Sequence, residues 1–235
     1  MIKKNVLITG ASSGLGKEIS ICLARNGYHC ILSSRNETLL GNVANQIRSE
    51  NYKCTVVPAD LTSEDSIENL YQSCQEFGFV EMIINNAGIG IFSKIEDASI
   101  VDFDKQISLN LRAPFILCKK FIPNMKSKSK GRIVFINSVA GKSGYPFSSS
   151  YVSSKFGLRG LSESLREELR QDGIKVISIH PGAIDTAFWD KVNADFSRDE
   201  MLLSKNVAND IVNALESSGN SVIEEMVIRR NKGDF

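Results

Sequence analysis

Short apolar runs alternate along this chain with longer segments in which apolar residues recur every three or four positions. The runs are continuously apolar rather than alternating with polar residues, which is typical of strands buried on both faces of a sheet. They predict seven strands, centred on residues 6–8, 30–32, 55–57, 82–84, 133–136, 176–179 and 226–228.

The segments between these runs have the spacing of amphipathic helices. In one of them Leu158, Leu161, Leu165 and Leu169 follow one another at intervals of three and four residues. A regular alternation of strand and helix predicts a parallel sheet that is covered by helices on both faces. We therefore expect one α/β domain over residues 1–235, with a doubly wound, Rossmann-type sheet of about seven strands.

Composition and charge exclude several classes of protein. The chain is 42% hydrophobic and 23% charged, and its net charge of +1 offers no electrostatic footprint for nucleic acid or an anionic membrane. No apolar stretch reaches about 18 residues, and the N-terminal apolar run is too short for a signal peptide. The five cysteines include no Cys-x-x-Cys pair, so we expect a cytoplasmic protein without a metal centre or disulfides.

A glycine-rich segment links the first predicted strand to the first predicted helix. Glycines there permit a tight turn and close approach of the backbone to a ligand, and the N–H groups at a helix start favour an anion. A P-loop is excluded because Glu18 follows Gly16-Lys17 where Ser or Thr is needed, and the spacing also differs from Gly-x-Gly-x-x-Gly. A plain strand-to-helix turn is the alternative. The segment consists of Gly10, Ala11, Ser12, Ser13, Gly14, Leu15 and Gly16.

The end of the second predicted strand bears on the type of nucleotide. An acidic residue there would bind the ribose hydroxyls and repel a 2′-phosphate, but this chain has Ser34 and Arg35. Because an arginine can donate two parallel hydrogen bonds to a phosphate, we expect NADP(H) to be preferred, with NAD(H) possible. A solvent-exposed arginine at a helix start is the alternative interpretation.

Polar residues also follow the later predicted strands. Tyr151 and Lys155 are four residues apart, which puts them on one face of a helix. Ser138 follows the fifth strand and precedes Tyr151 by 13 residues, and Asn110 lies in the helical stretch 107–117. Two further motifs follow the fourth and sixth strands. The motif after the fourth strand contains Asn86, Ala87 and Gly88, and the motif at the end of the sixth contains Pro181, Gly182, Ile184 and Thr186. Carboxyl ends of parallel strands face one crevice, so these groups should meet there.

In order and spacing these motifs resemble the short-chain dehydrogenase/reductase family, over nearly the whole chain. The resemblance implies hydride transfer between NADP(H) and a small carbonyl compound or its alcohol, with Tyr151 as general acid and base. Ser138 would hold the substrate oxygen, and Lys155 would grip the nicotinamide ribose and favour the phenolate. A positive charge at ~4 Å would supply about 4 kcal/mol toward lowering the tyrosine pKa. Asn110 would bend its helix and hold a water in a proton relay to Lys155.

The resemblance also implies a wider set of cofactor contacts. Asp60 would accept from the adenine amino group, although it could instead cap the next helix. The residues implied as cofactor-binding are Gly10, Ser12, Ser13, Gly14, Leu15, Gly16, Arg35, Asp60, Leu61, Asn86, Ala87, Gly88, Tyr151, Lys155, Pro181, Gly182, Ile184 and Thr186.

The substrate is not readable from the sequence. Residues 187–206 could close as an apolar lid over a small carbonyl compound, or they could form a surface helix. The lid side chains would be Phe188, Trp189, Val192, Phe196 and Met201, with walls from Ile91, Phe92, Tyr145, Pro146 and Phe147.

Three other functions stay open. A 3-oxoacyl-carrier-protein reductase is the alternative within the family, although such enzymes tend to carry a basic residue where Asp172 stands. A non-catalytic NADP(H)-binding sensor or scaffold would usually lack the Tyr or the Lys. A methyl-donor-dependent transferase would normally have an acidic residue in place of Ser34 and Arg35. The two histidines, His29 and His180, are expected to be structural.

We also expect a homodimer or homotetramer. The helix over residues 107–122 carries more apolar residues than one stripe needs, Phe115 among them, and surplus apolar surface implies a partner. Gly157 and Gly160 in the helix that carries Tyr151 would let a partner backbone approach closely. A closed two-fold arrangement is the commonest one for such a contact.

Overall fold

The computed structural model describes residues 4–190, 197–216 and 221–233. Its main strands are β1 (Asn5–Thr9), β2 (His29–Ser33), β3 (Cys54–Val56), β4 (Val80–Asn85), β5 (Gly131–Ile136), β6 (Ile174–Pro181) and β9 (Glu225–Ile228). Its α-helices are α1 (Gly14–Arg25), α2 (Glu37–Ser49), α3 (Glu64–Glu76), α4 (Ile100–Ile107), α5 (Ala113–Ser127), α6 (Ser149–Leu169) and α7 (Ser204–Leu215). None of the helices within these ranges is both long and apolar enough to cross a membrane.

These strands form one seven-stranded sheet in the order β3-β2-β1-β4-β5-β6-β9. Every neighbouring pair is parallel, and the register of β1 and β2 runs from Asn5 opposite His29 to Thr9 opposite Ser33. Each predicted run lies within one of these strands, except that the run 55–57 extends one residue beyond β3. The predicted Rossmann-type α/β sheet is therefore confirmed.

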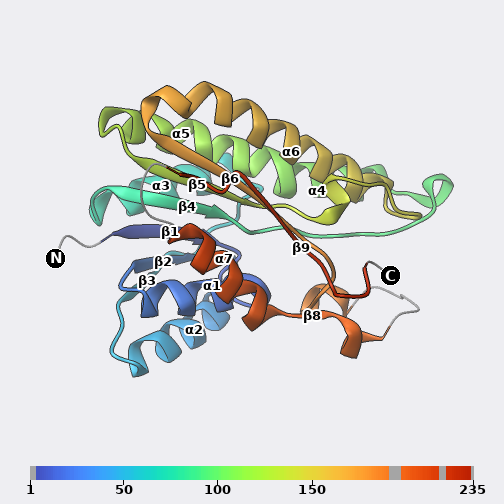
Figure 1. Ribbon diagram of the computed structural model, residues 1–235, viewed down its shortest axis with the longest axis horizontal. Coiled ribbons are helices and arrows are strands. Elements are labelled where there is room, and N and C mark those ends of the chain that lie inside the picture. The colour runs from blue at the N-terminus through green and yellow to red at the C-terminus, as the bar shows by residue number, and fades with distance from the viewer. Residues whose placement is uncertain (1–3, 191–196, 217–220, 234–235) are drawn as a thin grey trace.

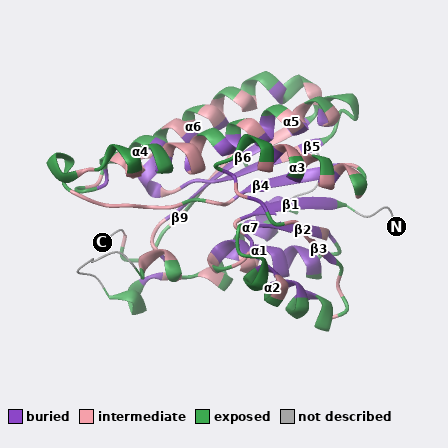
Figure 2. Ribbon diagram, turned by 180° about the vertical axis from the view of Figure 1, so that it is seen from behind, coloured by how far each residue is buried: buried purple, intermediate pink, exposed green. Residues whose placement is uncertain are grey.

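Side chains of each strand point alternately into two apolar cores. Val6 and Ile8 of β1 lie in the core that α1, α2 and α7 cover, whereas Leu7 lies in the core that α3, α5 and α6 cover. Figure 1 shows the two helical layers on opposite sides of the sheet, and Figure 2 shows the strands as the most completely buried part. Because both faces are covered, the strands need no polar face, which explains their continuously apolar sequences.

The spatial order of the strands reverses next to β1. From β1 the chain adds β2 and β3 on one side, and then returns to place β4 on the other. The connections that leave the carboxyl ends of β1 and β4 therefore diverge. Such a reversal opens a crevice at that edge of the sheet, where α/β proteins bind their ligands.

Several local features depart from the predicted pattern. β7 (Ile184–Asp185) and β8 (Leu202–Leu203) form a separate parallel pair that is too short to leave a periodic signal. The helical stretch predicted over 107–117 contains a π-turn at residues 108–112, between α4 and α5. A Cβ on Gly157, which is expected from the sequence to face a partner, would lie 2.7 Å from the Leu111 side chain of the same chain, whereas one on Gly160 would meet nothing within 4 Å.

Gly16 lies in a closely packed environment and Gly41 in an open one, so alanine should have opposite effects on stability at the two positions. A methyl group on Gly16 of α1 would collide with the Gly10 carbonyl and the Asn86 amide, whereas one on Gly41 of α2 would meet nothing within 4 Å. We expect Gly16→Ala to lower the free energy of unfolding by about 1–3 kcal/mol through overpacking. The control Gly41→Ala should raise it by about 0.5–1 kcal/mol, because alanine favours a helix. Chemical denaturation measures both, and shifts of the same sign would contradict this packing.

Candidate active site

The glycine-rich turn after β1 uses backbone angles that favour glycine at two positions. Gly10 has a φ of +64° and Gly14 has a φ of +53°. A Cβ on Gly10 would lie 2.8 Å from the Asn86 amide nitrogen, and one on Gly14 would lie 3.1 Å from the Thr186 side chain. The turn is therefore closely packed against the segments that follow β4 and β6.

The start of α1 differs from the starts of the next two helices. Asn36 caps α2 by accepting a hydrogen bond from the Leu39 N–H at 2.9 Å, and Ser63 caps α3 in the same way. Ser13, at the start of α1, makes no side-chain capping bond. The first N–H groups of α1 are thus available to an anion, which the helix dipole also favours.

Thr9 and Asn86 join the ends of β1 and β4. The Thr9 hydroxyl accepts hydrogen bonds from the backbone N–H groups of Asn86 and Ala87, at 3.0 and 3.1 Å. The Asn86 side-chain amide donates to the carbonyls of Thr9 and Gly10, at 2.9 and 3.2 Å. These bonds fix the segment 86–88 against the glycine-rich turn at the mouth of the crevice.

The loops after β2 and β3 bring Arg35 near Asp60. Hydrogen bonds from the backbone and then the hydroxyl of Thr62 lower the pKa of Asp60, and the charge of Arg35 contributes less. Arg35 is exposed, and the neighbouring Ser34 hydroxyl is buried with no hydrogen-bond partner in the described part of the chain. A guanidinium beside an unpaired hydroxyl can bind an anion such as a phosphate. The cap of α3 is Ser63, so Asp60 does not serve as that cap.

The remaining residues expected at the cofactor lie along the same edge of the sheet. Leu15, Leu61 and Ile184 are buried, whereas Ser12 and Gly182 are partly exposed. Gly182 donates its N–H to the Ile228 carbonyl at 2.8 Å, which anchors the segment after β6 to β9. Pro181 is the last residue of β6.

Ser138, Tyr151 and Lys155 lie together between the end of β5 and the first turns of α6. Ser138 lies close enough to Tyr151 for its hydroxyl to lower the pKa of the phenol, and Lys155 Nζ lies 5.7 Å from the centroid of the Tyr151 ring. The ammonium of Lys155 donates to the Ile136 carbonyl at 3.0 Å. Ser138 Oγ accepts from the Ala140 N–H at 3.1 Å, which leaves the hydrogen of the serine hydroxyl free to be donated.

Burial shifts both titratable groups of this trio toward their neutral forms. It raises the pKa of Tyr151 to about 12, against the opposing effect of the Ser138 hydrogen bond. It also lowers the pKa of Lys155 to about 8. The sequence predicts that the charge of Lys155 lowers the pKa of Tyr151. In the structure the loss of hydration raises the pKa of Tyr151 instead, and the ammonium of Lys155 binds the Ile136 carbonyl.

Asn110 lies in the π-turn between α4 and α5 and connects it to two other segments. Its side-chain oxygen accepts from the Ile89 N–H at 2.9 Å. Its amide donates to the Ile89 carbonyl at 2.8 Å and to the Ser154 hydroxyl at 3.0 Å. Asn110 therefore fastens the loop after β4 to the helix that carries Tyr151 and Lys155. Nothing in the sequence distinguishes Ser154 from its neighbours, so its part in this contact is not predictable.

Aromatic side chains surround Tyr151 on the side of the segment after β7. The ring centroids of Phe92 and Phe188 lie 5.5 and 5.9 Å from that of Tyr151. Trp189 stacks on Phe92, with centroids 6.1 Å apart and an angle of 3° between the planes. The side chains of Phe92, Phe188 and Trp189 thus form an apolar wall beside the phenol.

The other residues predicted to form the lid belong to several different segments. Met201 is buried, and α7 begins at Ser204, within the range predicted for the lid. Val192 and Phe196 lie outside the described residues. Arg198, which no sequence motif indicates, fastens the segment 185–190. It donates to the carboxylates of Asp185 and Asp190 and to the Thr186 carbonyl, at 2.7, 2.6 and 2.8 Å.

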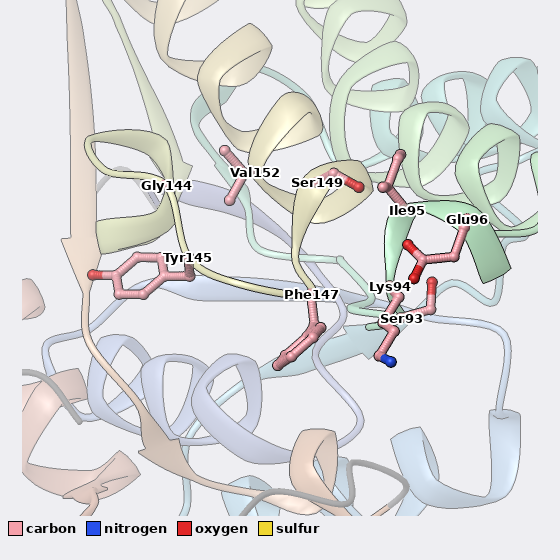
Figure 3. A pocket seen from close by; sticks show the side chains of 9 residues that line it. All are labelled: Ser93, Lys94, Ile95, Glu96, Gly144, Tyr145, Phe147, Ser149 and Val152. Atoms are coloured by element: carbon pink, nitrogen blue, oxygen red, sulfur yellow. The ribbon is translucent and has the colours of Figure 1, made fainter.

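A hollow of about 540 Å³ lies between the loops at 93–96 and 144–149, and Val152 forms part of its lining. Figure 3 shows Tyr145 and Phe147 on one side of it and Lys94, Ile95 and Glu96 on another. Tyr145 and Phe147, which are expected as walls of the substrate site, line this hollow. Neither Ser138 nor Tyr151 belongs to its lining.

The described ranges contain no candidate metal site and no exposed cysteine. They contain no group of three or more His, Cys, Asp or Glu residues that could hold a metal ion. The five cysteines are free and buried, and burial raises the pKa of each thiol. They lie in α1, β2, β3, α3 and α5, at positions 22, 30, 54, 74 and 118.

Comparison with known sequences points to one family. A sequence profile described as short chain dehydrogenase matches residues 4–197. Sepiapterin reductase of Chlorobaculum tepidum is 32% identical over 242 residues, which cover 100% of this chain and 99% of that protein. An uncharacterized oxidoreductase of Staphylococcus epidermidis is 31% identical over 228 residues, with 97% of each protein covered.

Solved structures show the same likeness over nearly the whole chain. An alcohol dehydrogenase from the archaeon Thermococcus sibiricus, complexed with 5-hydroxy-NADP, has a TM-score of 0.90 at 27% identity, with 97% of each chain covered. A metagenomic short-chain oxidoreductase in complex with NADP has a TM-score of 0.85 at 28% identity, again with 97% of each chain covered.

The burial of Lys155 generates a prediction on stability. Its folded pKa of about 8 lies below its ordinary value of 10.5, so the unfolded chain binds the extra proton between these pH values. This group therefore destabilises the fold below about pH 8, and the penalty disappears as the pH rises toward 10.5. Relative to Lys155→Met, the wild type should gain about 2 kcal/mol in free energy of unfolding between about pH 7.5 and 9.5. Denaturant titrations at the two pH values measure this difference, and a constant difference would contradict the depressed pKa.

Proposed function

The chain belongs to the short-chain dehydrogenase family of oxidoreductases, and on that premise we propose that it interconverts a small carbonyl compound and its alcohol with NADP(H). One observation carries the proposal: Ser138, Tyr151 and Lys155 converge at the carboxyl edge of the sheet, with Lys155 close to Gly88 after β4. These groups supply a hydrogen-bond donor, a neutral acid and a cation. They are the groups that a reduction by hydride transfer requires from a protein.

The residues at this edge fit a dinucleotide. The uncapped start of α1 suits a pyrophosphate, and Gly10 and Gly14 let the turn before it pack closely on Asn86 and Thr186. Gly88 fits the same interpretation, because a Cβ there would lie 3.8 Å from Lys155 Nζ, where a ribose would be gripped. When bound, NADPH supplies the hydride.

The protein's own part in the reaction concerns the substrate oxygen. The Ser138 hydroxyl, fixed by the Ala140 N–H, would donate to that oxygen and hold it near the phenol. Tyr151 is neutral at pH 7, so it would donate its proton as charge develops on the oxygen. In the reverse direction the phenolate would remove the proton from the alcohol. The Ser138 hydrogen bond, which opposes the raised pKa of Tyr151, would favour that phenolate.

Lys155 and Asn110 would support this proton transfer indirectly. Lys155 would bind the nicotinamide ribose and stabilise the phenolate by its charge. The side chain of Asn110 has protein partners for its oxygen and for both amide hydrogens, so it would hold the bend in the helix. A relay water at this position would have to bind the main-chain carbonyl of Asn110 instead.

Arg35 supports NADP(H) over NAD(H). It stands beside the unpaired Ser34 hydroxyl and close enough to Asp60 for its charge to act there. A 2′-phosphate would satisfy both the guanidinium and the hydroxyl. The complexes of the two structural relatives with 5-hydroxy-NADP and NADP agree with this preference.

The wall of Phe92, Phe188 and Trp189 favours a substrate with an apolar body next to its carbonyl group. Arg198 is already paired with Asp185 and Asp190, so it offers little to an anionic substrate. The likeness to a protein named sepiapterin reductase supports a small substrate as well. We take residues 1–235 as one domain in the cytoplasm, with Phe188 and Trp189 of the predicted lid covering the substrate next to Tyr151.

The alternative functions find less support. Acyl-carrier-protein reductases tend to carry a basic residue where this chain has Asp172, and Asp172 forms an ion pair with Lys126 at 3.0 Å. An anionic carrier would meet a carboxylate there. A non-catalytic sensor has no use for a tyrosine and a lysine that are brought together at the edge of the sheet.

An assembly of two or four copies also belongs to the proposal. Phe115 on α5 and Phe156 on α6 are 54% and 43% exposed, which is unusual for side chains of this size. A shallow groove beside Phe115 is lined by Ile122, Leu161 and Leu165. Apart from Phe115, the apolar residues of α5 pack against the core of their own subunit. The contact would therefore be centred on Phe115.

The assignment of Arg35 is tested by reversing its charge. Arg35→Asp should raise the dissociation constant of NADPH at least tenfold, about 1.4 kcal/mol, because it places a carboxylate against the 2′-phosphate. NADH should be affected less. The control Lys53→Asp makes the same change in charge just before β3, at the opposite edge of the sheet. Fluorescence titration with both nucleotides measures the effect, and an unchanged ratio of affinities would refute the assignment.

The role of Tyr151 is tested by removing its hydroxyl. Tyr151→Phe should lower the turnover number by a factor of about 10²–10⁴, because the general acid is lost, while NADPH still binds. NADPH oxidation over a panel of aldehydes, ketones, dicarbonyls and acyl thioesters measures turnover and identifies the substrate class. Tyr71→Phe, in α3, serves as the control. Undiminished turnover in Tyr151→Phe would remove Tyr151 as the proton donor.

The proposed contact between copies is tested at Phe115. Phe115→Glu should reduce the assembly to a monomer of 25.9 kDa without unfolding it, because the side chain is already half exposed. Leu39→Glu, at a 42% exposed position of α2 in the opposite layer, should leave the assembly intact. Sedimentation at micromolar concentration distinguishes the species. A monomeric wild type would contradict the assembly.

A further inference from the structure

His180 is a buried titratable residue for which the proposed reaction has no direct use. It lies next to the last residue of β6 and is 0% exposed. Its Nδ1 lies 3.1 Å from the carbonyl oxygen of Ser138, and its Nε2 lies 3.0 Å from the hydroxyl of Ser178. The imidazole therefore connects the inside of β6 to the residue expected to hold the substrate oxygen.

The partners of His180 settle which ring nitrogen carries the hydrogen. A carbonyl oxygen can only accept, so Nδ1 must be the donor to Ser138. In the neutral ring Nε2 is then an acceptor, and the Ser178 hydroxyl donates to it. Burial lowers the pKa of His180, which keeps the ring neutral and this pattern in place at pH 7.

Ser138 depends on such a contact because it lies beyond the end of β5. The preceding residue, Asn137, donates its N–H to the Ile179 carbonyl at 2.8 Å. The Ser138 carbonyl accepts from the Gly141 N–H at 2.9 Å and from His180, so both of its lone pairs are engaged. A peptide held in this way cannot rotate, and its rotation would carry the Ser138 hydroxyl away from Tyr151.

The charged groups that face His180 come from three further elements. Glu225 of β9 lies 3.8 Å from Nε2. The same carboxylate pairs with Lys142, just after Ser138, at 2.7 Å, and approaches Arg159 of α6 at 3.9 Å. The carboxylate favours the protonated ring and the two cations oppose it, so the loop of Ser138 is tied to β6, β9 and α6 around a neutral imidazole.

We propose that His180 is a positioning residue of the active site. By donating its Nδ1–H to the Ser138 carbonyl, it holds the serine hydroxyl in line with the Tyr151 phenol and the substrate oxygen. This inference rests on the proposed carbonyl–alcohol activity. His29 shows the contrast, because it bonds to Asn5 and Thr55 at the opposite end of the sheet.

The test compares two replacements that differ in the donor. An asparagine amide can occupy the position of Nδ1, whereas leucine offers no donor at a similar size. His180→Leu should lower kcat by about ten- to a hundredfold, as displacements of a catalytic group of about 1 Å do, with little change in the NADPH dissociation constant. His180→Asn should recover most of kcat. If both variants have the same kcat as the wild type, or if His180→Asn is as impaired as His180→Leu while its circular dichroism shows the native fold, the proposal is wrong.

Two controls separate positioning from stability. Ser178→Ala removes the partner of Nε2 and leaves the bond to Ser138, so it should lower the melting temperature and spare kcat. His29→Leu makes the same change outside the site and should behave likewise. A kcat that falls in all variants in proportion to their melting temperatures would mean that His180 acts only through stability, and would overturn the proposal.

The pH profile supplies a readout that stability does not move. In the direction of alcohol oxidation, the rate should rise as Tyr151 loses its proton. Displacing Ser138 removes a hydrogen bond that favours the phenolate, so this rise should occur at higher pH in His180→Leu and at the wild-type pH in His180→Asn. An unmoved profile in His180→Leu would contradict the role. Absence of NADPH-dependent turnover in the wild type, or full turnover in Tyr151→Phe, would instead refute the proposed function itself.

Discussion

Thr9 and Asn86 fasten the ends of β1 and β4 to each other, and the placement of the other functional groups depends on that junction. The sheet is parallel, and its strand order reverses at this junction. The segments that follow several of the strands therefore lie together at one edge of the sheet. Short polar side chains from distant parts of the sequence then meet without long insertions. The same closeness leaves Gly10 no room for a side chain.

Much of this arrangement is predictable from the sequence, for physical reasons. A strand covered on both faces needs a continuously apolar run, so all seven strands of the main sheet are recognisable. A residue just after a parallel strand lies at the same edge as the first turns of the helix that follows. Ser138 and Tyr151, 13 residues apart, are therefore expected neighbours, and the spacing of Tyr151 and Lys155 puts both on one face of α6.

What the sequence does not reveal depends on depth and on pairing at long range. The sequence shows that a lysine follows a tyrosine by four residues. It does not show that burial raises the pKa of Tyr151 to about 12 and lowers the pKa of Lys155 to about 8. The partners of Arg198 and the bond of His180 to Ser138 likewise come from elements that only the fold brings together. The strands β7 and β8, with two residues each, are too short to produce a period.

The five buried thiols can be used to measure local unfolding of the chain. Cys22, Cys30 and Cys54 lie in the core covered by α1, α2 and α7, whereas Cys74 and Cys118 lie in the core covered by α3, α5 and α6. A buried thiol of raised pKa reacts with an alkylating reagent only when its surroundings open to water. The labelling rate of each cysteine, read by mass spectrometry of peptides, would thus follow the opening of the two layers separately. No engineered label is needed, because these thiols are native to the chain.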